Sequence, residues 1–320
     1  MRQARISIVN THCPGLIEDD CVILERAKER IHCVARDRPD LVLLPEVFAN
    51  HRYAHVQDPS TARLVAQQVA ETVPGPLSEE LAELAEAYHM YIAFGLLRRD
   101  GPRYYNSLVL LDRQGHHVWT YDKLTPLDAE MTECGISPGG MPSALDCDFG
   151  RIGAAICFDI NFPELAEIYA HQEVELLLFA SAFPAGRLLD AWSLRYGFAI
   201  ASSTHYHNNR VLDCTGTTVA RTSDLLPYAT AVLNLNRRVV HMDRNLAKLD
   251  LLRTRYAGSV IVEDMRDEAL CVITSLEQGL EVADLIKEFD IMLRPAYFDY
   301  SRSVREQHGG MTASASGMQP

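Results

Sequence analysis

RIGAAICFDINFPELAEIYAHQ, residues 151–172, is the stretch that decides the fold. An apolar run of strand character ends at Cys157, and Pro163 then opens a helical segment, because proline suits the first turn of a helix. A side chain at such a junction is exposed to the backbone N–H groups and the positive end of the helix dipole. That environment lowers the pKa of a thiol and stabilises an oxyanion, which makes Cys157 a candidate nucleophile. Taken alone, the same position is more often that of a buried core thiol.

Short apolar runs alternate with longer amphipathic segments along the rest of the chain, which predicts an α/β layer structure. The runs NSLVLL and HVWTYDK, separated by the turn-like DRQGH, predict a hairpin and therefore a mixed sheet. Further strands are predicted at ISIV, LVLL, YIAFGLL, ELLLFAS, ASSTH, NRVLD, TTVAR and YATAVLNLN, and helices at about 16–36, 60–72, 78–89, 163–171 and 188–200.

The domain organisation follows from the absence of a Gly/Ser/Pro-rich linker, which favours one domain over two. We expect a core over residues 1–236 and an extension of the same domain over 237–300, at a subunit interface. The small polar residues of 301–320 predict a disordered tail.

The composition is that of a globular protein, with 48% hydrophobic and 23% charged residues among 320. A formal charge of −13 and the lack of a long basic run exclude a nucleic-acid partner. No apolar run approaches the roughly 20 residues of a membrane span, and the opening MRQARISIVN lacks the apolar core of a signal peptide. We therefore expect a cytoplasmic protein with no membrane partner.

Eight cysteines are scattered without a C-x-x-C pair, as free thiols in a reducing compartment would be. His205 and His207, and Cys13 beside His12, come nearest to metal-ligand spacing, but isolated pairs of this kind are usually structural. The sequence therefore predicts no metal.

Two more polar residues stand at the exits of apolar strands. Glu46 follows LVLLP, where poor solvation would raise its pKa toward the range of a general base. Lys123 ends the strand that contains Trp119 and Tyr121. Taken alone, Glu46 and Lys123 could each be interpreted as an ordinary solvent-exposed residue at the end of a strand. Ligand sites in α/β sheets gather at the carboxyl ends of strands, so the joint occurrence with Cys157 predicts a site.

This trio resembles the Glu–Lys–Cys triad of the nitrilase superfamily, in the same order. The stretches LLPE, the K-L-x-P-x-x-x-E run at 123–130 and CFDINFPE are similar to its motifs, and the similarity covers about residues 5–235. The resemblance implies an α-β-β-α sandwich, no cofactor, and hydrolysis of a non-peptide C–N bond in a small-molecule amide, carbamoyl compound or nitrile. It also implies a homodimer or larger homo-oligomer.

The resemblance further implies the roles of the residues. Glu46 would take the thiol proton, Cys157 would attack the carbon, and Lys123 with the backbone N–H of Phe158 would stabilise the developing charge. Family members carry a second glutamate near the lysine. Glu130 is preferred for it, and Glu133 is the alternative.

Several positions depart from the family pattern or compete with it. Gly197 and Phe198 stand where relatives carry Glu-Asn, which puts part of the pocket wall in doubt. Asn161 stands where branches that accept carboxylate substrates carry an arginine, which favours a neutral or cationic substrate unless Arg187 or Arg195 supplies the charge.

Two sequence features separate this chain from other nucleophilic hydrolases. GISPG at 135–139 matches the letters of a G-x-S-x-G elbow, but Pro138 has no N–H for an oxyanion hole, so Ser137 is excluded and SPGG is interpreted as a turn. Phe158-Asp159 resembles amidase-like branches rather than the Trp-Glu of nitrilases proper. Amide hydrolysis is therefore the first hypothesis, nitrile hydrolysis the second, and a non-catalytic binding protein on the same fold the third.

Overall fold

The computed structural model describes residues 2–11, 18–50, 56, 58–205 and 208–309. They fall into two compact units, residues 2–235 and the residues from 236 onward. Among the described residues, no helix is both long enough and apolar enough to cross a membrane.

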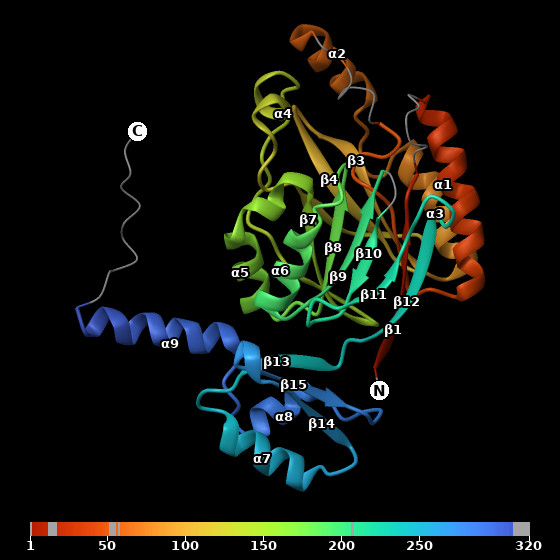
Figure 1. The fold of residues 1–320 in the computed structure, drawn as a ribbon. Coiled ribbons are helices and arrows are strands. Elements are labelled where there is room, and N and C mark those ends of the chain that lie inside the picture. Colours follow the sequence, from red (N-terminus) through yellow and green to blue (C-terminus); the bar gives the residue numbers. More distant parts are fainter. Residues whose placement is uncertain (1, 12–17, 51–55, 57, 206–207, 310–320) are drawn as a thin grey trace. The chain divides into compact units, whose positions relative to one another are not determined.

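The first unit holds two mixed six-stranded sheets (Figure 1). Sheet A has the order β12-β1-β2-β3-β4-β5 and sheet B the order β11-β10-β9-β8-β7-β6. In each sheet the central pairs are parallel, β1-β2-β3 and β7-β8-β9, and the outer pairs are antiparallel.

The strands have the following bounds. Sheet A contains β1 (Gln3–Val9), β2 (Leu41–Leu43), β3 (Tyr91–Asp100), β4 (Arg103–Leu111), β5 (His117–Asp122) and β12 (Tyr228–Asn234). Sheet B contains β6 (Leu145–Cys147), β7 (Gly150–Ile156), β8 (Leu176–Ser181), β9 (Ala199–Thr204), β10 (Arg210–Leu212) and β11 (Thr218–Arg221). The predicted hairpin is therefore β4-β5, and the mixed sheets are confirmed.

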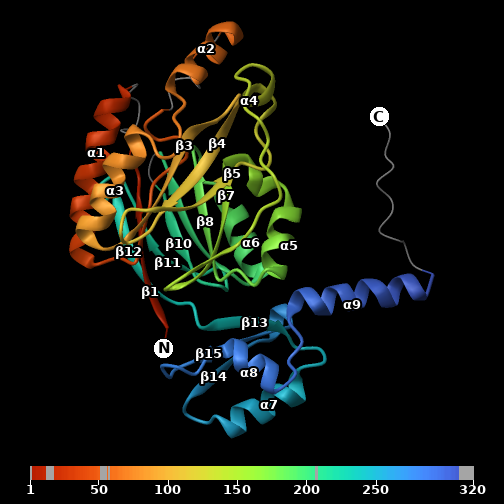
Figure 2. The same ribbon diagram turned by 180° about the vertical axis from the view of Figure 1, so that it is seen from behind.

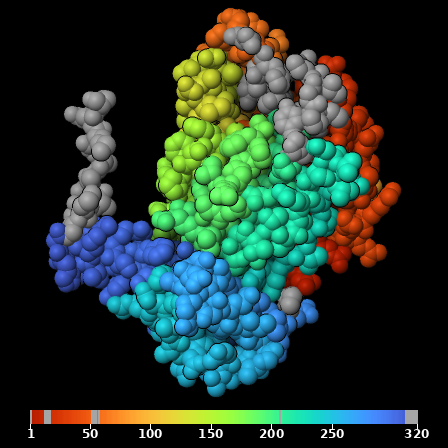
Figure 3. Space-filling model, in the orientation of Figure 1, coloured from red at the N-terminus to blue at the C-terminus, as the bar shows by residue number. Residues whose placement is uncertain are grey.

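Helices cover the outer face of each sheet, which completes the α-β-β-α sandwich (Figures 1 and 2). Helices α1 (Asp20–Val34) and α3 (Pro76–Tyr88) pack on sheet A, while α5 (Pro163–His171) and α6 (Arg187–Tyr196) cover sheet B. Side chains of α5 and α6 form the green surface in the space-filling view (Figure 3). Two further helices, α2 (Pro59–Val69) and α4 (Asp128–Thr132), lie near the ends of the strands that carry the site.

The short strand β2 shows why a strand at the centre of the sandwich can be apolar throughout. The side chains of Leu41 and Leu43 lie in the core between sheets A and B. The side chain of Val42 lies in the core between sheet A and the helices that cover it. Successive side chains of a strand point to opposite faces, so a strand buried on both faces cannot alternate with polar residues.

Helix α6 ends earlier than the sequence predicted. We expected a helix to residue 200, but α6 ends at Tyr196 and Gly197 adopts a φ of 77°. Glycine enters this left-handed region without a steric penalty and commonly terminates helices. Phe198 is fully buried, and the chain then continues as β9.

The second unit has a three-stranded antiparallel sheet, β13-β15-β14, and a hydrophobic core of its own. Its elements are β13 (Arg237–His241), α7 (Leu246–Arg255), β14 (Val260–Met265), β15 (Leu270–Ser275), α8 (Val282–Glu288) and α9 (Arg294–Gln307). Residues 237–300, predicted as an extension of the first domain, cluster in the compact unit that runs from residue 236 onward. Residues 301–307, predicted to belong to a disordered tail, are helical, and 310–320 lie outside the described residues.

Candidate active site

The three residues singled out in the sequence lie at strand ends on the same side of the sandwich. Glu46 follows β2, Lys123 follows β5 and Cys157 follows β7. Strand β5 runs in the same direction as β2, because β3 is parallel to β2 and two antiparallel pairings lead from β3 to β5. Sheet A therefore supplies Glu46 and Lys123, and sheet B supplies Cys157.

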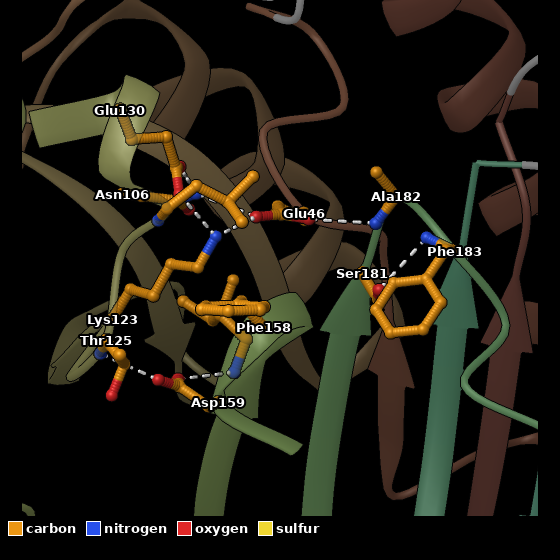
Figure 4. A network of polar contacts seen from close by, with 12 residues as sticks. Glu46, Asn106, Lys123, Thr125, Glu130, Phe158, Asp159, Ser181, Ala182 and Phe183 are labelled. Atoms are coloured by element: carbon orange, nitrogen blue, oxygen red, sulfur yellow. Dashed lines mark hydrogen bonds and ion pairs between the residues drawn. The ribbon is translucent and has the colours of Figure 1, made fainter. Parts of the chain in front are cut away.

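The ammonium group of Lys123 lies between two carboxylates (Figure 4). Its Nζ is 3.0 Å from Oε1 of Glu46 and 2.7 Å from Oε2 of Glu130. The Nδ2 of Asn106 donates to the same two carboxylates, at 2.7 Å and 2.8 Å. The three charged residues are almost completely buried, with exposed fractions of 5% for Glu46, 1% for Lys123 and 7% for Glu130. Glu130, the residue preferred in the sequence analysis as the second glutamate, therefore contacts Lys123 directly.

The backbone around this cluster is also fixed. The N–H of Leu127 donates to Oε2 of Glu130 at 2.7 Å, which anchors the start of α4. The N–H of Gly139 donates to the carbonyl of Lys123 at 2.8 Å. A Cβ at position 139 would lie 2.1 Å from the carbonyl oxygen of Asp122, so only glycine allows the SPGG segment to approach this closely.

The pKa of Glu46 is lowered, contrary to the sequence prediction that it would be raised. Burial opposes ionisation and is the largest single influence on this carboxyl. The charge of Lys123 and hydrogen bonds from Lys123 and Asn106 together outweigh it. The strand-exit position predicted the burial but not the ammonium beside it. Glu46 is therefore an ionised carboxylate in the resting protein.

The pKa of Lys123 is raised above its ordinary value. Burial alone would lower it, but the charges of Glu46 and Glu130 act in the opposite direction and are stronger. Lys123 therefore keeps its positive charge across the physiological range, and it can stabilise negative charge without giving up a proton.

Cys157 begins a short 3₁₀ turn, Cys157–Asn161, and adopts a positive φ of 50°. Its thiol is half-buried, and burial followed by the negative charge of Glu46 raises its pKa to about 12. Glu46 and Ser181 lie within hydrogen-bonding reach of the sulfur. The sequence analysis expected the elbow to lower this pKa, but desolvation outweighs the stabilisation from Lys123. The resting sulfur is therefore a neutral thiol beside an ionised carboxylate.

The turn after Cys157 presents backbone donors. The first N–H groups of a helical turn have no partner within that turn, and Phe158 occupies this position. Its N–H therefore suits the oxyanion role inferred from the sequence. Asn161 lies at the other end of the turn, where its Nδ2 donates to the carbonyl of Phe158 at 3.0 Å and the side chain is exposed.

Several residues that hold Glu46 were not predicted from the sequence. Asn106 lies within β4, and the backbone N–H of Ala182, after β8, donates to Oε2 of Glu46 at 2.8 Å. His205 follows β9 and is buried, and its Nε2 is 2.5 Å from the carbonyl oxygen of Glu46. The strand-exit rule could have found His205, which was considered only as a metal ligand. No group of three His, Cys, Asp or Glu in the described ranges has a metal-binding arrangement.

A cavity of about 200 Å³ opens onto the thiol and the charged cluster. It is lined by Glu46, Val56, Ala62, Lys123, Leu127, Ala129, Glu130, Glu133, Cys134, Cys157 and Ala182. Glu133 thus lies in the wall, although it does not contact Lys123. Of the described residues in this lining, none is an arginine. Arg187 is an exposed residue at the start of α6, and it, Arg195 and Asn161 lie outside the lining.

The geometry defines a class of protein: an α-β-β-α sandwich with a cysteine, an ammonium and two carboxylates where its two sheets meet. The sequence profile of the carbon-nitrogen hydrolase family matches residues 5–262. The chain therefore belongs to the carbon-nitrogen hydrolase family, and its resemblance to the nitrilase superfamily is confirmed.

Curated relatives agree with this assignment. The omega-amidase NIT2 of Danio rerio is 28% identical over 192 residues, which cover 57% of this chain and 65% of the relative. NIT2 of Bos taurus is 31% identical over 169 residues, or 50% and 58% of the two chains. The bifunctional nitrilase/nitrile hydratase NIT4B of Nicotiana tabacum is 31% identical over 133 residues, or 42% and 35%. The match spans less than two thirds of the length of these relatives.

Solved structures share the fold. An amidase from Nesterenkonia sp. superimposes with a TM-score of 0.58 at 19% identity, covering 72% of this chain and 89% of that chain. A variant of the Nesterenkonia sp. AN1 amidase carries the acetamide moiety of fluoroacetamide covalently added at its active-site cysteine, with a TM-score of 0.59, 19% identity and the same coverage. The predicted α-β-β-α sandwich is confirmed by this similarity.

Proposed function

We propose that this chain is a cysteine-dependent amidohydrolase that releases ammonia from a small amide or carbamoyl compound. The observation that carries the proposal is the meeting of the Cys157 thiol, the ionised Glu46 and the charged Lys123 at one cavity. Family membership and the omega-amidase and amidase relatives support the same chemistry.

The resting protonation states determine the first step. The thiol of Cys157 holds its proton and Glu46 is an ionised acceptor within reach of it. The proton moves from Sγ to the Glu46 carboxylate as Sγ forms a bond to the substrate carbonyl carbon. The carbonyl π electrons move to oxygen, and Lys123 and the N–H of Phe158 stabilise that oxyanion.

The second half of the reaction uses the same residues. The oxyanion re-forms the carbonyl as the C–N bond breaks, and Glu46 returns its proton to the leaving nitrogen, so ammonia departs and a thioester remains. Water then gives a proton to Glu46 and attacks the thioester carbon. The C–S bond breaks, the sulfur recovers a proton from Glu46, and the carboxylic acid leaves. Glu130 and Asn106 hold Lys123 and Glu46 in place throughout.

The cavity also indicates a substrate class. A volume of about 200 Å³ suits an amide of a few carbon atoms. The charged groups of its described lining are one ammonium, Lys123, and three carboxylates, Glu46, Glu130 and Glu133. Glu46 and Glu130 both pair with Lys123, so no positive charge in this lining is left for a substrate carboxylate. The lining therefore favours a neutral or cationic substrate over one with a second carboxylate.

A nitrile substrate is the second candidate, and the nitrilase relative supports it. Attack of the same thiol on a nitrile carbon would place negative charge on nitrogen, where Lys123 could stabilise it equally well. Matched substrates separate the two: ammonia release should follow butyramide and not butyronitrile. Release from the nitrile alone would reverse the assignment.

The test combines turnover with trapping of the cysteine. Ammonia release is measured for butyramide, 4-aminobutyramide and succinamate, and fluoroacetamide labelling is followed by intact mass. We expect turnover of the first two and one adduct, with both lost in Cys157→Ala. Cys21→Ala is the matched control, because Cys21 is an exposed thiol outside the described lining and its loss should change neither readout. Labelling of Cys21 without any turnover would contradict the proposal, and a preference for succinamate would contradict the substrate class.

We also propose a cytoplasmic homo-oligomer. Six cysteines of the described ranges are free thiols, in keeping with a reducing compartment: Cys21, Cys33, Cys134, Cys147, Cys157 and Cys271. Exposed leucines after the edge strand β11, with 91% exposure at Leu225 and 61% at Leu226, suit a contact between subunits. Light scattering after size-exclusion chromatography tests this proposal. Leu225→Ser should shift the molar mass toward that of a monomer, and a wild-type protein that is already monomeric would contradict the proposal.

A further inference from the structure

Asp159 is a fully buried carboxylate outside the cavity lining, and it accepts hydrogen bonds from three donors. Its Oδ2 accepts from the N–H of Ile156 at 2.9 Å and from the hydroxyl of Tyr121 at 2.7 Å. Its Oδ1 accepts from the N–H of Thr125 at 2.8 Å (Figure 4). A buried charge is tolerated only when it is satisfied in this way.

The positions of these donors are informative. Thr125 is two residues after Lys123, at the end of a strand of sheet A, and Ile156 directly precedes Cys157, at the end of a strand of sheet B. One carboxylate therefore joins the backbone that carries the ammonium to the backbone that carries the thiol. Asparagine could not replace it, because its NH₂ group would face a backbone N–H.

We propose that Asp159 is a positioning residue that sets the spacing between Lys123 and Cys157, and that turnover requires its ionised form. This inference rests on the proposed function. Asp159 itself touches neither the cavity nor the reacting atoms, so its effect passes through the two chain segments that it holds.

The ionisation of Asp159 falls in an accessible range. Burial raises its pKa to about 6, against hydrogen bonds from Ile156, Tyr121 and Thr125 that lower it. The titratable groups that face it are Tyr121 and Lys123 from sheet A and Tyr169 from α5. Protonation adds an O–H donor beside two backbone donors, so either this new donor lacks an acceptor or the hydroxyl of Tyr121 must turn to accept from it.

The effect on stability has the opposite sign to the effect on turnover. A carboxyl whose pKa is raised in the folded state binds its proton more readily when folded. Between the ordinary value of 3.8 and about 6, this group therefore makes the fold more stable as the pH falls. An acid-side loss of activity near pH 6 that comes from Asp159 is then not accompanied by unfolding.

The test compares Asp159→Asn, Tyr121→Phe and the control Asp146→Asn, whose side chain is 75% exposed. Butyramide turnover and the rate of fluoroacetamide labelling are measured from pH 5 to 8, with the far-UV circular dichroism spectrum at each pH. In Asp159→Asn we expect kcat to fall roughly 100-fold, the loss typical of a misplaced catalytic group, with little change in KM. Tyr121→Phe removes a hydrogen bond that lowers the pKa of Asp159, so its acid limb should move to higher pH.

The outcomes separate this inference from the function. Ammonia release by the wild type with unchanged kcat in folded Asp159→Asn overturns the inference alone, whereas a wild type that releases no ammonia overturns the proposed function. If Asp159→Asn does not fold, Tyr121→Phe decides, because a purely structural Asp159 would leave the acid limb where it is. An unshifted limb in folded Tyr121→Phe therefore also overturns the inference.

Discussion

Replacing Lys123 with methionine should destabilise the fold in a way that depends on pH. The substitution keeps an unbranched side chain that is one atom shorter, but it leaves Glu46 and Glu130 buried without the ammonium that lies 3.0 Å and 2.7 Å from them. Removing one partner of a buried ion pair costs about 3–5 kcal/mol, because the remaining charge stays desolvated. We expect a loss of this size in the free energy of unfolding at pH 8.

The pH dependence follows from the pKa shifts. In the wild type, Glu46 has a lowered pKa, so its contribution is present above 4.5 and is lost as the pH falls through the folded value. Lys123 has a raised pKa, so its contribution is complete below 10.5 and is lost only as the pH rises through the folded value. Without Lys123, burial dominates at Glu46 and raises its pKa. Each pH unit below that raised pKa then restores about 1.4 kcal/mol to the free energy of unfolding of the variant.

Urea denaturation of Lys123→Met at pH 8 and pH 5.5 measures this, with the fluorescence of Trp119 and Trp192 as the signal and tests for two-state unfolding. The free energy of unfolding that Lys123→Met loses relative to the wild type should be smaller at pH 5.5 than at pH 8. Lys28→Met is the matched control, because Lys28 also contacts two carboxylates, at 2.9 Å and 3.0 Å, but has 26% side-chain exposure. Surface pairs of this kind contribute about 0–1 kcal/mol. An equal loss in both variants, or a deficit at Lys123 that is independent of pH, would refute the reasoning.

Two further substitutions test the support of the site. Gly139→Ala should lower the melting temperature and the turnover, because a Cβ there would lie 2.1 Å from the carbonyl oxygen of Asp122. Gly140→Ala is the control, because a Cβ at that position would have nothing within 4 Å. Equal shifts of the melting temperature in the two variants would count against the close approach. His205→Ala removes the contact with the carbonyl of Glu46 and should reduce kcat for butyramide at least about 10-fold with a smaller change in KM, because a small displacement of a catalytic group is costly. A normal kcat in steady-state assays of a folded His205→Ala would show that Glu46 is held without it.

The placement of Glu46, Lys123 and Cys157 could be predicted because each follows the end of a strand. Strands that run in the same direction deliver their carboxyl ends to the same side of a sheet, and this rule needs only the order of the strands. The exit of β9 obeys the rule as well, and His205 was missed because a histidine pair was compared only with metal sites.

The contacts that hold the cluster could not be predicted. Asn106 lies inside a strand, and its amide reaches Glu46 and Glu130 only because three distant segments meet. The backbone N–H of Ala182 has no signature in a sequence, since almost every residue carries the same donor.

The directions of the pKa shifts also required the structure. Burial and ion pairing act in opposite directions on Glu46, so the sign depends on their sum. Asn161 illustrates a similar limit, because the short turn after Cys157 leaves its side chain exposed and outside the cavity lining. The pattern placed it near the thiol in sequence but not on the same face of the turn.

Glu46 is held from both halves of the sandwich. Lys123 and Asn106 contact it from sheet A, while Ala182 and His205 contact it from sheet B. Facing sheets pack about 10 Å apart, at a separation that the interleaved side chains determine. The core between the sheets therefore acts as a spacer for the reacting groups. A conservative change of volume there would alter catalysis before it altered folding, so natural variation in this core should be narrower than stability alone would require.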